Sequence, residues 1–154
     1  MTVRRFALTT LIAASAVAFA GCSMMDSSSS SSSSMAKPMM SNMMTVPLSA
    51  RNEVPPNASG GSGTAKVELD GSVVKWTVTY DGMSGPVTAG HIHGPAPAGA
   101  NAGVVIPFAG SMASPITGSA TVTAAQIADM KAGLYYVNLH TAANPGGEIR
   151  GQVK

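Results

Sequence analysis

The chain has little of three things: cysteine, aromatic residues and charge. Cys22 is the only cysteine among 154 residues, so no disulfide can form within the chain. Charged residues make up 10% of the sequence, the formal net charge is +2, and lysine and arginine form no basic cluster. Nucleic-acid binding depends on such a cluster, so we expect no nucleic-acid partner.

The motifs of common hydrolases are also missing. No Gly-x-Ser-x-Gly sequence is present, and the few carboxylates do not form a close pair, since Asp81 belongs to a predicted turn and Asp129 to a predicted helix. The sequence therefore leaves an enzymatic activity open but favours a non-catalytic role.

Residues 1–21 have the features of a signal peptide. Arg4 and Arg5 precede an apolar stretch over residues 6–20, which is too short to span a membrane comfortably. The stretch ends in a Phe-Ala-Gly-Cys sequence that resembles the lipobox of bacterial lipoproteins and implies cleavage before Cys22. An ordinary secretory signal that leaves a free thiol is the alternative.

Lipidation would anchor the protein to a membrane. The resemblance implies that Cys22 carries fatty acyl chains such as palmitate and becomes the mature N-terminus. Because Ser23 rather than Asp follows, we expect the cell outer membrane, with the domain facing the periplasm or the cell surface.

We expect residues 22–44 to form a disordered tether. An unbroken serine run over residues 27–34 cannot bury enough surface to fold. Thioether sulfur is a soft ligand suited to Cu(I), so the methionines of this segment are either copper ligands or tolerated filler. They are Met24, Met25, Met35, Met39, Met40, Met43 and Met44.

Residues 45–154 have the length of one domain, and their pattern predicts an antiparallel sandwich or barrel. A single helix is expected where Thr123 and Gln126 form a capping box and Gly133 ends the helix. Alternating apolar residues predict short strands at residues 46–50, 64–69, 73–80, 87–93, 104–108, 119–123, 134–141 and 148–153.

The three histidines carry the sharpest functional hypothesis. His91 and His93 are two residues apart in a predicted strand, so both rings lie on the face opposite Ile92. His140 likewise alternates with Leu139. If the two strands are neighbours, three imidazoles converge on one point, which suits a copper or zinc ion, with copper favoured.

Two charged residues in the last predicted strand alternate onto the histidine face. Glu148 is expected to orient a ligand histidine or to complete the coordination, and Arg150 to attract an anion. Glu53 is a candidate contact of Arg150. The alternative for the histidines is that they bind no metal and hydrogen bond to the loops around Gly94 and Asn144.

Four phrases together resemble a CHRD domain, the module named after chordin, over nearly the whole predicted domain. They comprise residues 48–56, 89–96, 136–141 and 144–151. A second likeness is to copper–zinc superoxide dismutase, where a His-x-His strand and a later histidine supply copper ligands.

These resemblances imply a fold and a ligand. They imply an all-β, Greek-key antiparallel β-sandwich of the superoxide dismutase or immunoglobulin type, with one short helix. The chain lacks a fourth histidine to bridge copper to zinc, a zinc-ligand cluster and a cysteine pair. Copper binding is therefore expected rather than dismutation, and zinc is less favoured.

The sequence thus predicts a lipid-anchored cell-envelope protein whose domain at residues 45–154 binds copper. Two alternatives remain open at this stage. One is a metal-free adhesion or protein-interaction module. The other is a copper-dependent redox enzyme that uses the open coordination position.

Overall fold

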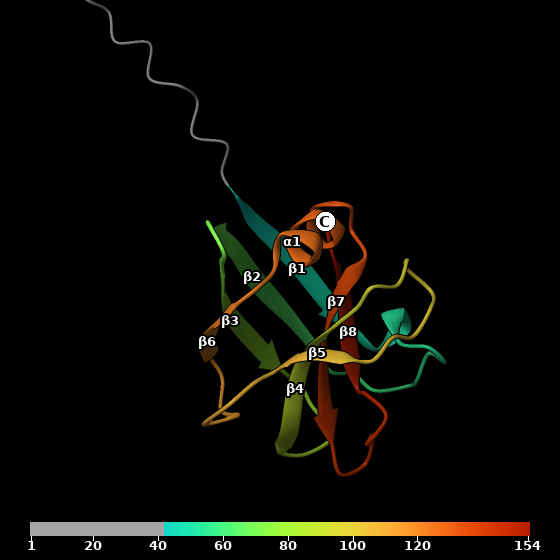
Figure 1. The fold of residues 1–154 in the computed structure, drawn as a ribbon. Coiled ribbons are helices and arrows are strands. Elements are labelled where there is room, and N and C mark those ends of the chain that lie inside the picture. Colours follow the sequence, from blue (N-terminus) through green and yellow to red (C-terminus); the bar gives the residue numbers. More distant parts are fainter. Residues whose placement is uncertain (1–41) are drawn as a thin grey trace, which may run out of the picture. The chain divides into compact units, whose positions relative to one another are not determined.

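Antiparallel strands dominate the computed structural model, which describes residues 42–154 (Figure 1). Within those residues, no helix is long and apolar enough to cross a membrane. A 3₁₀ helix, η1 (Ala50–Asn52), and an α-helix, α1 (Ala124–Lys131), accompany the strands. The strands are β1 (Met43–Ser49), β2 (Ser62–Asp70), β3 (Val73–Asp81), β4 (Val87–His93), β5 (Val104–Pro107), β6 (Ile116–Thr121), β7 (Tyr135–Thr141) and β8 (Ile149–Val153).

Residues 1–41 lie outside the described part of the chain. The predicted signal peptide, the lipidation at Cys22 and most of the predicted tether fall there. The last two tether residues, Met43 and Met44, begin β1, where they pair with Glu68 and Val67 of β2.

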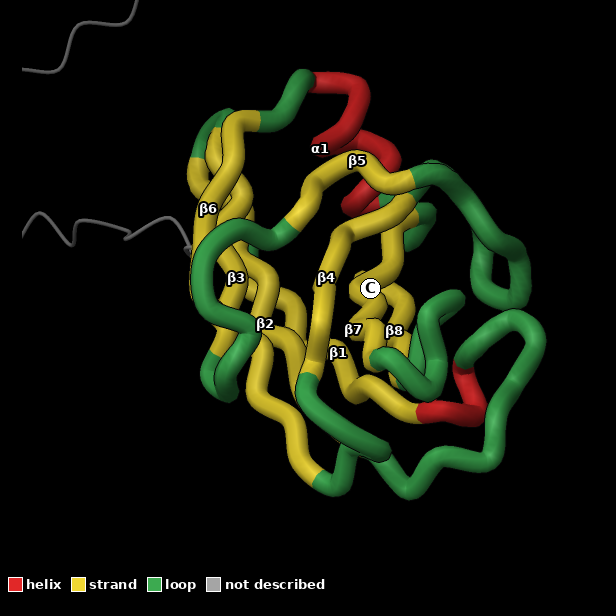
Figure 2. The backbone as a smooth tube through the Cα atoms, turned by 90° about the horizontal axis from the view of Figure 1, so that it is seen from below, coloured by secondary structure: helices red, strands yellow, loops and turns green. Residues whose placement is uncertain are grey.

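The eight described strands form one sheet in the order β5-β4-β7-β8-β1-β2-β3-β6. Three of the neighbouring pairs, β4–β7, β8–β1 and β3–β6, join strands that are distant in the sequence, as in Greek-key connections. The register between β1 and β8 consists of one pair, Ser49 with Arg150. The all-β prediction is confirmed. The two layers of the expected sandwich are the two halves of one sheet that curves nearly into a barrel (Figure 2).

The core lies between the two halves of the sheet. Val74, Trp76 and Val78 of β3 alternate onto the inner face and are at most 5% exposed. The Trp76 ring stacks on Phe108, which follows β5, with the ring centroids 4.8 Å apart. Ile92, Val137, Leu139 and Ile149 are fully buried in the other half. The alternation read from the sequence therefore assigns the inner face correctly.

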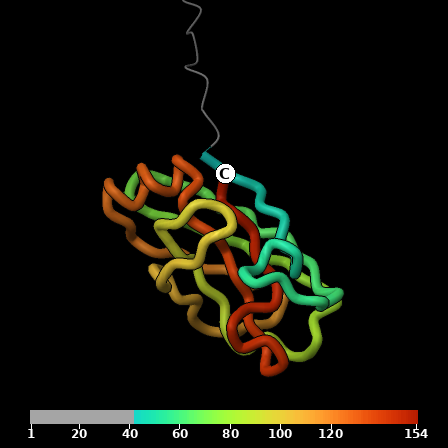
Figure 3. Tube along the Cα trace, turned by 90° about the vertical axis from the view of Figure 1, so that its right-hand side faces the viewer, coloured from blue at the N-terminus to red at the C-terminus, as the bar shows by residue number. Residues whose placement is uncertain are grey.

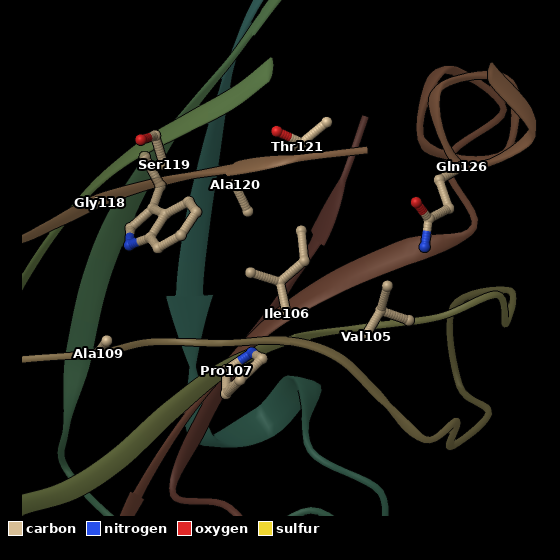
Figure 4. Close-up of a pocket in the computed structure, with 10 residues that line it drawn as sticks. Val105, Ile106, Pro107, Ala109, Gly118, Ser119, Ala120, Thr121 and Gln126 are labelled. Carbon is tan, nitrogen blue, oxygen red and sulfur yellow. The ribbon is translucent and has the colours of Figure 1, made fainter. Parts of the chain in front are cut away.

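The two edge strands, β5 and β6, do not pair with each other. A hollow of about 250 Å³ lies between them, lined by Trp76, Ile106, Gly118 and Gln126 among others (Figure 4). The Trp76 indole covers Gly118, where the Cβ of any larger residue would overlap the ring. Glycine is thus required where the indole meets β6.

The outer face of β4, β7 and β8 is covered, contrary to the polar, solvated face that alternation favours. Tyr136, Asn138 and Arg150 point outward yet are only 2–3% exposed. Two segments lie over them, residues 50–61 with η1 and residues 94–103, as the side view shows (Figure 3). Side-chain hydrogen bonds hold both segments to the sheet, for example from Asn52 to the Arg150 carbonyl at 3.1 Å.

The capping box predicted for the helix is confirmed. The Gln126 backbone N–H donates to Thr123 Oγ1 at 3.2 Å, and the Thr123 N–H donates to Gln126 Oε1 at 2.8 Å. Gly133 follows the helix with a φ of 75°, a conformation that favours glycine. Met130, which is fully buried, attaches the helix to the core.

Replacing Thr123 with alanine should lower the free energy of unfolding by about 1 kcal/mol, because one helical N–H loses its acceptor. Urea denaturation measures this change. Thr123→Ser keeps the hydroxyl and should stay near the native stability. Equal losses in the two variants would contradict a role for the cap.

Candidate metal centre

Strand pairing brings the three histidines together. β4 pairs with β7 so that Ala89 lies opposite His140 and His91 lies opposite Asn138. One ring nitrogen from each of His91, His93 and His140 lies within 4.8 Å of the other two. The convergence expected from the alternation of the two strands is therefore present in the structure.

Backbone carbonyls fix the orientation of two of the rings. Nδ1 of His93 lies 3.1 Å from the Ala102 oxygen, and Nδ1 of His140 lies 2.9 Å from the Pro145 oxygen. Carbonyl oxygens only accept hydrogen bonds, so both Nδ1 atoms carry the proton and both Nε2 atoms keep a lone pair. Such carbonyl contacts are typical of the outer shell around metal-binding histidines.

The lone pairs point into the cluster. His140 Nε2 lies 2.9 Å from His91 Nδ1, which places one shared proton between these two rings. His93 Nε2 is buried and has no hydrogen-bond partner among the described residues. The loop contacts expected for histidines that bind no metal are therefore present. They involve only Nδ1 of His93 and Nδ1 of His140.

The surroundings of the three imidazoles favour their neutral form. Burial lowers the pKa of His91, His93 and His140, and the neighbouring rings add to this shift for His91 and His93. Neutral imidazole is the form that binds metal ions, so burial favours the binding-competent state.

The nitrogen spacing fits a copper or zinc ion after small side-chain adjustments. Bonds of about 2.0–2.1 Å to one ion place ligand nitrogens roughly 3.3 Å apart in tetrahedral geometry. The shared-proton distance of 2.9 Å is slightly shorter, and the largest separation of 4.8 Å is longer. Three protein nitrogens leave a further position open to water or a small ligand.

Glu148 does not serve the histidines as expected. Its side chain is fully buried, and none of its described hydrogen bonds goes to a histidine ring. The reason is that residues 59, 84 and 144 bring closer donors to the carboxylate. These donors are Ser59 Oγ at 2.6 Å, Ser84 N at 2.7 Å, Ser84 Oγ at 2.5 Å, Asn144 Nδ2 at 3.1 Å and the Thr141 hydroxyl.

These donors also set the ionisation of Glu148. Burial alone raises the pKa of the carboxyl, but the hydrogen bonds from Ser59, Ser84 and Thr141 outweigh it and lower the pKa to about 2. Glu148 is therefore a buried, ionised carboxylate that ties together four chain segments.

Arg150 lies behind the histidines rather than beside them. Its guanidinium carbon is 3.4 Å from the centre of the Tyr136 ring, and the same ring stacks parallel to His93 with centroids 4.7 Å apart. Arg150 also donates to Asn101 Oδ1 at 2.8 Å and to the Ala100 carbonyl at 2.6 Å. Tyr136 thus separates Arg150 from the position where an anion was expected.

The roles of Tyr136 and Asn138 do not follow from the sequence pattern. Both alternate onto the face of His140, which was the available signal. Asn138 Nδ2 donates to both oxygens of Glu53 at 2.9 and 3.1 Å.

Burial raises the pKa of Glu53 to about 7, although Arg150, the Val54 backbone and Asn138 all act to lower it. No ion pair within 4 Å joins Glu53 to Arg150 in residues 42–154, so the two interact only at longer range.

Comparison with known proteins adds one finding. Residues 44–153 match the family model of the CHRD domain. Neither a curated protein nor a solved structure gave a match. The likeness to copper–zinc superoxide dismutase therefore stays a resemblance of short motifs.

Glu148→Gln should destabilise the fold at pH 7 by about 3 kcal/mol, because the hydrogen bonds that lower the pKa of Glu148 to about 2 favour the ionised carboxylate. The native pKa lies below the unfolded value. The carboxylate's contribution is therefore complete above pH 4.5 and is lost as the pH falls toward 2. Urea denaturation at pH 7 and pH 3 should show the gap between wild type and variant shrinking in acid.

Glu68→Gln is the matched control, because Glu68 is exposed on β2 and should change stability little at either pH. A gap for Glu148→Gln that stays constant between pH 7 and pH 3 would show that its ionisation is not what stabilises the fold.

Proposed function

The chain belongs to the CHRD domain family over residues 44–153, and from this premise we propose that it binds a metal ion through His91, His93 and His140. Two observations carry the proposal: one ring nitrogen of each histidine lies within 4.8 Å of the other two, and Nε2 of His93 is buried without a hydrogen-bond partner among the described residues. A buried acceptor without a donor is costly, and a bound cation would satisfy it.

Copper is the favoured ion. Imidazole nitrogen suits both copper and zinc, but divalent copper binds such sites more tightly than zinc does. The cluster contains three histidines and no carboxylate or thiolate from the described residues, a donor set that both ions accept, so the preference for copper rests on its tighter binding.

The proposed setting is the cell envelope. A lipid anchor at Cys22 would hold the domain at the outer membrane, facing the periplasm or the surface, where it captures or buffers copper. The methionines of residues 24–44 would act as a low-affinity collector of Cu(I). Support for these parts of the proposal comes from the sequence alone.

One equivalent of copper should raise the melting temperature of the purified chain. Stabilisation by a ligand follows mass action and reaches about 4 kcal/mol at a free concentration of 1,000 Kd. His91→Ala and His140→Ala should each abolish most of this gain. Calorimetric titration and thermal unfolding with and without copper measure the effect.

The control is Thr123→Ala, which weakens the helix without touching the cluster and should keep the full copper-induced shift. If wild type takes up no stoichiometric copper and melts at the same temperature with it, the metal proposal fails. The metal-free interaction module would then be the better account.

The anchor has its own test. Cys22→Ser should move the protein from the membrane fraction to the soluble fraction of a Gram-negative host, because no acyl chain can then be attached. Ser23→Asp is the matched variant. It should stay membrane-bound but move from the outer to the inner membrane on a sucrose gradient. Membrane retention of the Cys22→Ser protein would rule the lipid anchor out.

A further inference from the structure

A buried positive charge lies one aromatic ring away from the histidine cluster. In the sheet, β7 runs between β4 and β8, and Tyr136 pairs with His93 of β4. Arg150 of β8 pairs with Asn138, but its guanidinium reaches over the Tyr136 ring. Tyr136 is 3% exposed, Arg150 is 2% exposed and His93 is 9% exposed. With so little water between them, the charge of Arg150 is poorly screened at the cluster.

The charges around the cluster are unbalanced. Burial is the main cause of the lowered pKa of His93, and the Arg150 charge acts in the same direction. Among the described residues, no carboxylate contributes to the pKa shift of any of the three histidines. Glu148 is held by hydroxyl and amide groups elsewhere, and Glu53 is held by Asn138. An ion bound to the histidines therefore meets three neutral ligands and one nearby cation.

We propose that Arg150, acting across Tyr136, makes the three-histidine cluster selective for monovalent copper over Cu(II) and Zn(II). This inference rests on the proposed metal binding and specifies which ion the cluster binds. A divalent ion carries one more unit of charge to be repelled by the guanidinium, and Glu53 offsets that guanidinium charge only in part. Cu(I) also accepts three ligands in a trigonal arrangement, whereas Cu(II) prefers tetragonal coordination with at least four ligands.

Arg150 and Tyr136 have a positioning role as well, which an experiment must separate from the charge. Arg150 holds Asn101 and the Ala100 carbonyl, and the Tyr136 hydroxyl bonds to the backbone of Ala102. The Ala102 oxygen in turn orients His93. A substitution that loosens this loop would weaken the binding of every ion, whereas loss of charge alone changes the ratio between ions.

The test compares Arg150→Gln with Arg150→Lys in the purified full chain. Affinities for Cu(I), Cu(II) and Zn(II) are measured by competition with chromophoric chelators specific for each ion. Arg150→Gln should lower the ratio of Cu(I) to Cu(II) affinity by about tenfold. For a one-electron couple, this equals a fall of about 59 mV in the copper reduction potential. Arg150→Lys should keep most of the native ratio.

Lys75→Gln is the matched control. It also removes one positive charge, but Lys75 is exposed on β3 in an ion pair with Asp70, so the ratio should not change. Glu53→Gln shifts the balance the other way, because Glu53 partly offsets Arg150. At pH 8, where Glu53 is ionised, this variant should raise the ratio by about threefold. It keeps the inference testable if Arg150→Gln does not fold.

The results separate the two proposals. A wild-type chain that prefers Cu(II) or Zn(II), or ratios unchanged in folded Arg150→Gln and in Glu53→Gln, overturns the selectivity and leaves metal binding standing. A wild-type chain that binds no copper in either oxidation state overturns both.

Discussion

The pairing of β4 with β7 is the contact on which the candidate site depends. These strands are separated by β5, β6 and α1 in the sequence, yet they lie side by side because the same strands present Ile92, Val137 and Leu139 to the core. A shift of one residue in either strand would exchange the two faces and expose these apolar side chains. Hydrophobic burial on the inner face therefore fixes the register that brings the histidines together on the outer face.

The outer face adds a second constraint, because its polar groups are buried under segments with little regular structure of their own. Such segments cannot satisfy their backbone groups internally and rely on the sheet for partners. Arg150 donates to the Ala100 carbonyl, and two side-chain contacts add to it. Glu148 accepts from the Ser59 hydroxyl, and Asn138 donates to the Glu53 carboxylate. The turn that ends at Gly147 packs directly over Glu53 and Asn138, where any Cβ would collide. The result is a rigid polar layer in which the histidine rings have fixed orientations.

The sequence predicted what depends on local pattern. Alternation gave the inner face of every long strand, the capping box gave the start of α1, and the His-x-His spacing gave two of the three ring positions. Alternation did not predict the surroundings of Glu148 and Arg150. It assigns a side chain to one face of the sheet but does not say whether that face is buried. Whether that face is solvated depends on residues 50–61 and 94–103, which fold over it from distant parts of the chain. Tyr136 was overlooked for the same reason.

The hydrogen bonding of the histidines distinguishes a purely structural role from a ligand role. A histidine that only braces a loop needs one good contact and can leave its other nitrogen to water. Here His93 Nδ1 has its contact, but Nε2 is shut away from solvent beside two other rings whose nitrogens face the same point. A buried nitrogen without a hydrogen-bond donor, within a cluster of three imidazoles, favours a cation as the missing partner. Because the Arg150 guanidinium lies against Tyr136, which stacks on His93, a singly charged ion would meet less repulsion in the proposed site than a divalent one.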